Sequence, residues 1–68
     1  MKWCILRIDK RTESIKIMPR RFQNLDKITA RNMCVAMACP KIKTYYVPCP
    51  QHLDKQSMIE YVQRYGIS

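Results

Sequence analysis

The stretch KWCILRIDKRTESIKIM, residues 2–18, decides the fold of this chain. Residues 2–9 are rich in β-branched and aromatic types, residues 10–13 are polar, and residues 14–18 alternate before Pro19. Two such runs joined by a short polar loop predict a β-hairpin. With the loop at 10–13, Ile8 faces Ile15 and Leu6 faces Ile17.

The pleat of this hairpin separates its side chains onto two faces. One face is expected to form the core and carries Cys4, Leu6, Ile8, Ile15 and Ile17. The opposite face carries Trp3, Ile5, Arg7, Lys16 and Met18.

Residues 25–38 are predicted to form the first helix, with Asn24 as its N-cap and Asp26 in its first turn. Lys27 and Arg31 should point away from its buried side, toward solvent. The apolar stripe expected to be buried consists of Leu25, Ile28, Val35, Ala36 and Cys39.

A second helix is predicted over residues 54–65, with a buried stripe of Met58, Tyr61, Val62 and Tyr65. Gly66 fits the left-handed cap of this helix. The segments QNLDK (23–27) and QHLDK (51–55) match at four of five positions. We interpret them as two similar helix starts rather than as a duplication.

Residues 41–47 alternate and predict a third strand, which should stop before Pro48 and Pro50. One of its faces carries Ile42, Thr44 and Tyr46, and the other carries Lys41, Lys43, Tyr45 and Val47. The order is then ββαβα. The sequence predicts a single α+β domain over residues 1–68, with one helix on the core face of a three-stranded sheet and a C-terminal amphipathic helix.

The formal net charge is +8, from 13 basic and 5 acidic residues. All of the excess falls within residues 1–48, whereas residues 49–68 are neutral. One glycine and one histidine exclude a P-loop, a dinucleotide fingerprint and a two-histidine zinc helix. Without a long apolar run or a signal peptide, we expect a cytoplasmic protein with free thiols and no membrane partner.

Basic side chains interleaved with aromatic rings are typical of nucleic-acid-binding surfaces, because cations neutralise phosphates and rings stack on bases. If the third strand joins the hairpin, its basic face continues the face of Trp3. Two other interpretations remain open: the second helix covers this face, or the cations form a solvated surface. The predicted binding residues are Arg7, Lys16, Arg20, Arg21, Lys27, Arg31, Lys41, Lys43 and Tyr45. Lys10 and Arg11, at the hairpin tip, are additional candidates.

The sequence supports a metal site or a catalytic site less strongly than a nucleic-acid-binding surface. Cys34, Cys39, Cys49 and His52 are a legitimate set of zinc ligands. Cys34 and Cys39, however, converge only if the helix ends early. The carboxylates are scattered, and Pro50 disfavours a Cys49–His52 nucleophile and base. We therefore expect neither a cofactor nor a metal, and no enzymatic activity.

The sequence thus predicts a small, non-enzymatic nucleic-acid-binding protein that acts mainly through electrostatic phosphate contacts. Either DNA or RNA satisfies the pattern. The alternative is a small inhibitor or adaptor that docks on an acidic surface of a larger protein or of a nucleic-acid-processing enzyme, using its charge, an exposed strand edge or Trp3.

Overall fold

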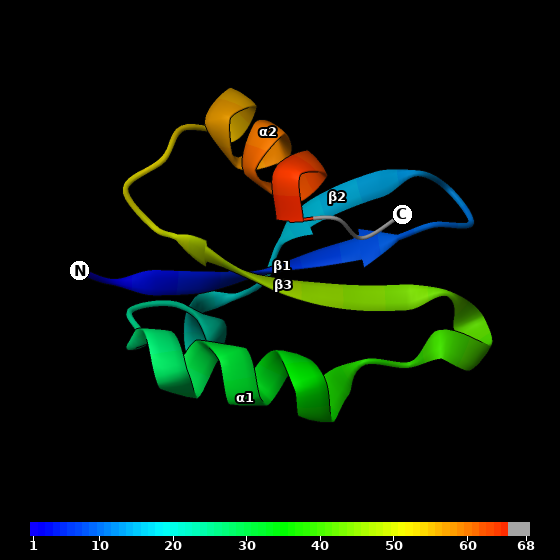
Figure 1. The fold of residues 1–68 in the computed structure, drawn as a ribbon, viewed down its shortest axis with the longest axis horizontal. Helices are drawn as coiled ribbons and strands as arrows, with labels where there is room; N and C mark the ends of the chain where they lie inside the picture. The colour runs from blue at the N-terminus through cyan, green and yellow to red at the C-terminus, as the bar shows by residue number, and fades with distance from the viewer. Residues whose placement is uncertain (66–68) are drawn as a thin grey trace.

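The computed structural model describes residues 1–65 and has the expected α+β architecture (Figure 1). The predicted Gly66 cap lies outside the described residues. The elements, in chain order, are β1 (Trp3–Asp9), β2 (Ser14–Ile17), the short 3-10 helix η1 (Arg20–Phe22), α1 (Lys27–Met37), the short 3-10 helix η2 (Pro40–Ile42), β3 (Thr44–Pro50) and α2 (Lys55–Tyr65).

The sheet has three antiparallel strands in the order β2-β1-β3, so that β1 is central. The hairpin register agrees with the sequence prediction, since Ile8 pairs with Ile15 and Leu6 pairs with Ile17. The polar residues 10–13 form the connection, in which Glu13 adopts a positive φ of 55°.

The predicted bounds of the third strand are wrong. Lys41 lies in η2, Lys43 adopts a left-handed conformation with φ 55°, and β3 continues through Pro48 and Pro50. The prolines are tolerated because β3 is an edge strand. The Gln51 N–H donates to the Lys2 oxygen (3.0 Å). Because hydrogen-bonded pairs alternate along antiparallel strands, Pro48 and Pro50 fall at positions whose peptide groups point away from β1.

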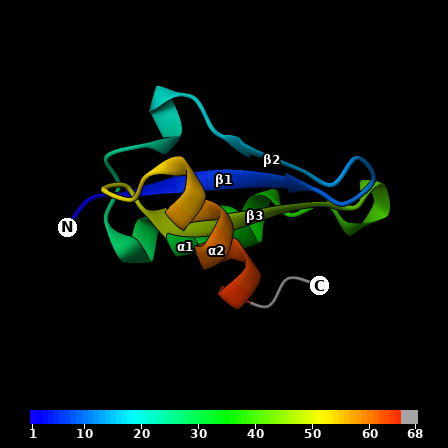
Figure 2. The ribbon, with the colours of Figure 1, turned by 90° about the horizontal axis from the view of Figure 1, so that it is seen from above.

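The two helices cover opposite faces of the sheet (Figures 1 and 2), but not as the sequence predicted. On the expected core face, Met58 and Val62 of α2 pack with Cys4, Leu6 and Ile8. Helix α1 instead covers the other face of β1. The chain enters α1 through a bridge in which Leu25 and Trp3 exchange backbone hydrogen bonds of 2.8 and 2.9 Å. That bridge starts α1 beside the N-terminal end of β1.

The buried stripe of α1 also differs from the prediction. Ile28 and Val35 are 71% and 75% exposed, although both were expected in the core. The residues that face the sheet are Ala30, Met33, Cys34 and Met37. The second half of this helix is apolar on all sides, so its periodicity does not determine its rotation. The small side chains of Ala30 and Cys34 let the helix approach Ile5 closely.

Both helices begin at an aspartate N-cap. The Asp26 carboxylate accepts the Thr29 N–H (3.4 Å), and the Asp54 carboxylate accepts the Ser57 N–H (2.7 Å). These aspartates occupy equivalent positions in QNLDK and QHLDK, which confirms both segments as helix starts. Asn24 is not the predicted cap. It has a positive φ of 56° and exchanges hydrogen bonds of 2.7 and 3.1 Å with Gln51.

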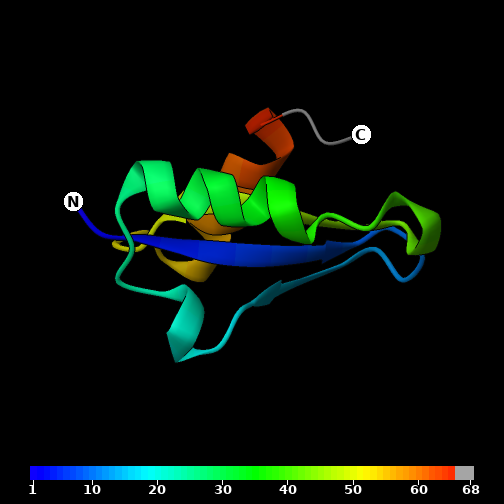
Figure 3. The same cartoon turned by 90° about the horizontal axis from the view of Figure 1, so that it is seen from below.

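Both helices lie over the β3 side of the sheet. Helix α1 packs on β3 and β1, while α2 packs mainly on β3. Strand β2 stands apart from them, as Figures 2 and 3 show, and its Ile17 is 51% exposed. As a result, the β2 side of the sheet is the least covered part of the fold.

Candidate nucleic-acid interface

Arg7 of β1 and Lys16 of β2 form the centre of the candidate interface. They are direct partners in the antiparallel ladder and both are exposed. By the alternation of the strands, their side chains lie on the α1 side of the sheet. Both cations remain open to solvent, because α1 packs more on β3 than on β1 and does not reach β2.

A shallow hollow of about 80 Å³ lies at this pair and is also lined by Asp9 and Ser14. The Asp9 carboxylate accepts the backbone N–H of Arg11 (3.0 Å), and the Ser14 hydroxyl lies 2.8 Å from that of Thr12. The hollow therefore combines two cationic side chains with a hydroxyl and one carboxylate that is already hydrogen-bonded to the turn.

Arg20 and Arg21 continue this basic surface beyond the end of β2. Both lie in η1 and are exposed. The Arg21 guanidinium lies 5.9 Å from the centre of the Phe22 ring, and Phe22 packs against the core under α1. Figure 3 shows β2 leading directly into η1. We call the residues Arg7, Lys16, Arg20 and Arg21 the basic strip.

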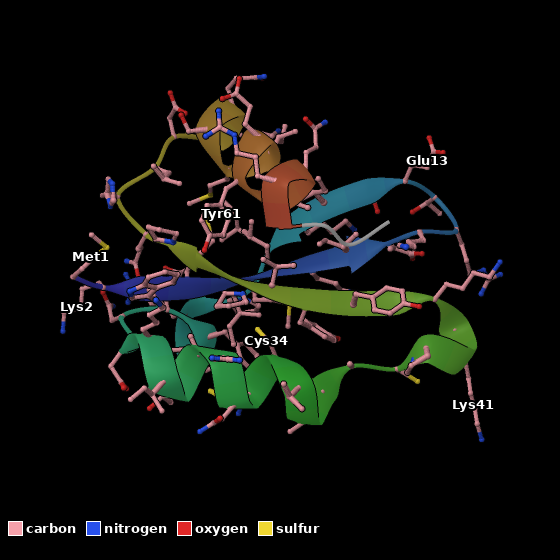
Figure 4. All side chains as sticks on the ribbon, viewed as in Figure 1. Met1, Lys2, Glu13, Cys34, Lys41 and Tyr61 are labelled. Atoms are coloured by element: carbon pink, nitrogen blue, oxygen red, sulfur yellow. The ribbon has the colours of Figure 1, made fainter. Side chains whose placement is uncertain are left out.

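Lys41 and Lys43 lie at the hairpin end of the sheet and not on a strand face as predicted. The Lys10 N–H donates to the Lys43 oxygen (3.0 Å), which ties the hairpin turn to the turn after η2. Figure 4 shows Lys41 projecting at the end opposite Met1 and Lys2. We call Lys10, Arg11, Lys41 and Lys43 the basic tip. The sequence indicated Lys10 and Arg11 as candidates, but no local pattern showed that Lys10 contacts Lys43.

Lys27 and Arg31 are exposed on α1, as predicted. The Lys27 ammonium lies 5.6 Å from the centre of the Trp3 ring, within cation–π distance. These two cations therefore belong to α1 rather than to the basic strip, and Lys27 lies over Trp3 at the start of β1.

The predicted aromatic platform does not form. Tyr45 lies on the α2 face, where it packs against the core and has the Lys10 ammonium 5.1 Å from its ring centre. Trp3 lies on the α1 face and meets the Tyr61 ring edge-on at 6.5 Å. The part of this face near Trp3 is covered, as one of the alternatives from sequence held, but mainly by α1, and α2 contributes the contact of Tyr61 with the Trp3 ring.

Outside the basic surfaces, the groups with shifted pKa values are the two capping aspartates and the buried thiols. Hydrogen bonding to Thr29 lowers the pKa of Asp26, and hydrogen bonding to Ser57 lowers the pKa of Asp54. Burial raises the pKa of the Cys34 thiol to about 11 and that of the Cys49 thiol to about 12. Neither thiol is a nucleophile near neutral pH, because the reactive species is the thiolate.

The proposed zinc ligands do not converge. Cys34 is buried under α1 and Cys49 is buried under α2, on opposite faces of the sheet. Within the described part of the chain, no three His, Cys, Asp or Glu side chains are arranged to hold a metal ion.

Comparisons with known protein families, with curated proteins and with solved structures find no match for the chain. Among residues 1–65, no helix has the length and apolar character needed to cross a bilayer.

Proposed function

We propose that this protein binds nucleic acid, as a non-enzymatic cytoplasmic protein, by placing the basic strip and the basic tip along a phosphate backbone. The observation that carries the proposal is the cross-strand pair Arg7 and Lys16. Like charges directly opposite each other in neighbouring strands destabilise a sheet. A bound phosphate would relieve that repulsion.

The arrangement of the cations supports a linear polyanion as the ligand. The basic strip follows the β1–β2 side of the sheet, and the basic tip lies at the end of the same hairpin (Figure 3). A nucleic-acid backbone lying along the hairpin would reach both. Arginine side chains suit this role because the guanidinium fork matches phosphate geometry.

The loss of the aromatic platform makes the proposed contacts mainly electrostatic. Trp3 meets the Tyr61 ring edge-on and has the Lys27 ammonium over its own ring, and Tyr45 packs against the core. Contacts to phosphates position a nucleic acid but carry no direct sequence information. We therefore expect broad binding to DNA and RNA, with little preference for base sequence.

The test is a titration of fluorescein-labelled duplex and single-stranded DNA, each repeated with RNA, at several salt concentrations. Affinity should fall steeply with salt, because each phosphate contact on duplex DNA contributes about −0.9 to the log–log slope. Binding that is absent at low salt, or that does not change with salt, would overturn the proposal.

A further inference from the structure

The outer edge of β2 offers unpaired peptide groups. The Met18 N–H donates to the Ile5 oxygen (3.1 Å), which fixes the alternation of hydrogen bonds between β2 and β1. In this register the peptide groups of Lys16 face Arg7 of β1. The N–H and C=O groups of Ile15 and Ile17 therefore point away from the sheet.

The opposite edge of the sheet is blocked over most of its length. On β3, Pro48 and Pro50 occupy outward-facing positions and have no N–H to donate. Nearer the start of the strand, Thr44 and Cys39 exchange backbone hydrogen bonds of 3.0 and 3.2 Å. Proline on an edge strand is a common protection against pairing with another chain. Within β2 there is no proline, so the two edges differ in their capacity to accept a further strand.

An apolar groove of about 410 Å³ lies beside this open edge, between the sheet and α2. Its apolar lining comes from Leu6, Ile15, Ile17, Met58 and Ile59. Lys16 and Lys55 complete the lining. On the other face of the hairpin, Arg7 of β1 and Lys16 of β2 form the cationic pair. A strand added to β2 would thus have an apolar environment on one side and a cationic one on the other.

We propose that the edge of β2 takes up an extended segment of a partner protein in which apolar and acidic residues alternate. Backbone hydrogen bonds to Ile15 and Ile17 would continue the sheet, as in other cases of strand addition. Apolar side chains of the segment would enter the groove. Acidic side chains would lie on the opposite face, beside Lys16 and Arg7.

A second copy of the chain fits this edge poorly. Two copies would bring together two molecules that each carry a net charge of +8. If their β2 strands paired about Lys16, the two lysines would also face each other directly, which is unfavourable. Charge complementarity therefore selects an acidic segment from another protein. The acidic side chains of the segment would share Arg7 and Lys16 with the proposed nucleic-acid interface, so the two partners should compete. Strand addition itself does not require nucleic-acid binding.

The test uses a blocked synthetic peptide of alternating valine and glutamate, seven residues long, and amide hydrogen exchange of the full chain followed by NMR. At a peptide concentration of about 100 times Kd, exchange that requires the free state should slow about 100-fold. The slowing should be greatest at the amides of Ile15 and Ile17. An alternating valine–lysine peptide should have no such effect.

Two variants of Ile17, with Ile42→Thr as their control, distinguish strand addition from simple filling of the groove. Ile17→Pro removes an outward N–H without removing a hydrogen bond to β1, and it should abolish peptide binding. Ile17→Thr should weaken binding, whereas Ile42→Thr should not. Ile17 and Ile42 form a matched pair because they are 51% and 49% exposed. None of these substitutions removes a cation, so binding to DNA should be preserved in folded variants.

Several results would overturn the proposal. One is the absence of protection at Ile15 and Ile17 in millimolar valine–glutamate peptide. Others are equal binding of the lysine peptide, or shifts at Met58 and Ile59 without amide protection. A dimer of the free protein that already protects the two amides would assign the edge to a second copy.

Discussion

Arg7 lies directly opposite Lys16 in the β1–β2 ladder, and neither side chain is covered by a helix. A pair of like charges in this position weakens the hairpin by an amount comparable to other cross-strand pair energies, about 0.2–1 kcal/mol. A bound anion between the two side chains would offset this repulsion. Removing one cation of the pair should therefore raise the stability of the protein and lower its affinity for nucleic acid.

Lys16→Gln should stabilise the protein and weaken its binding to nucleic acid. Removing one cation relieves the repulsion with Arg7, so the free energy of unfolding should rise by up to about 1 kcal/mol. Urea denaturation at low salt measures this change. Lys55→Gln, which removes the same charge from the start of α2, is the matched control. A variant that is less stable and binds DNA with unchanged affinity would contradict the assignment.

Arg21→Gln should weaken binding to all sequences by similar factors and reduce the magnitude of the salt slope by about 0.9 on duplex DNA. Arg64→Gln makes the same chemical change on α2, across the sheet from the basic strip. The slopes of the two variants are compared in parallel anisotropy titrations. Equal changes in both slopes would show that net charge alone, and not the basic strip, determines binding.

Lys43→Gly should have opposite effects on stability and on binding. Lys43 has a φ of 55°, a conformation that costs a residue with a Cβ about 1 kcal/mol but that glycine adopts freely. Thermal unfolding should therefore show an increase in Tm. Loss of the ammonium from the basic tip should reduce the salt slope. If the slope stays constant, the tip lies outside the interface.

Cys39 should be the first thiol to react in the folded protein, because it is the one partly exposed cysteine among four. Cys4, Cys34 and Cys49 are buried, and burial raises the pKa of each thiol. Titration with a chromogenic disulfide at pH 8 should release about one equivalent quickly and the rest only in urea. Rapid reaction of all the thiols in the native state would contradict the two buried clusters.

The three buried thiols, Cys4, Cys34 and Cys49, predict a loss of stability at high pH. Their pKa values are raised on folding, so the folded state favours the protonated form. This contribution is complete below the ordinary thiol pKa of 9.0 and is lost as pH rises toward the folded values of about 11 for Cys34 and 12 for Cys49. The urea midpoint should fall across this range. Replacing Cys34 and Cys49 by alanine in separate variants should reduce the pH dependence, whatever the change in baseline stability.

The hairpin was predictable from sequence because its register depends on local alternation and a short polar turn. The rotation of α1 was not, because MCVAMAC (residues 33–39) is apolar on every side and docking on the sheet decides which residues are buried. The strand through Pro48 and Pro50 was missed for a related reason. Proline excludes a central strand, but only the tertiary structure shows that β3 lies at an edge.

For the interface, sequence reasoning identified exposed cations correctly and failed on their grouping. Lys10 and Lys43 are distant in the chain, and they meet through a backbone hydrogen bond that no local pattern indicates. Tyr45 was placed on the wrong face because the predicted strand was out of register with β1. A one-residue change in register moves every side chain to the other side of a sheet.

The salt dependence of duplex DNA binding by the unaltered protein tests the central claim most directly. If the four cations of the basic strip each contact a phosphate, the log–log slope should be about −3.6, and contacts from the basic tip should make it steeper. Anisotropy titrations from 50 to about 200 mM salt give this slope. A slope near zero, or no binding to DNA or RNA at the lowest salt concentration, would contradict the account.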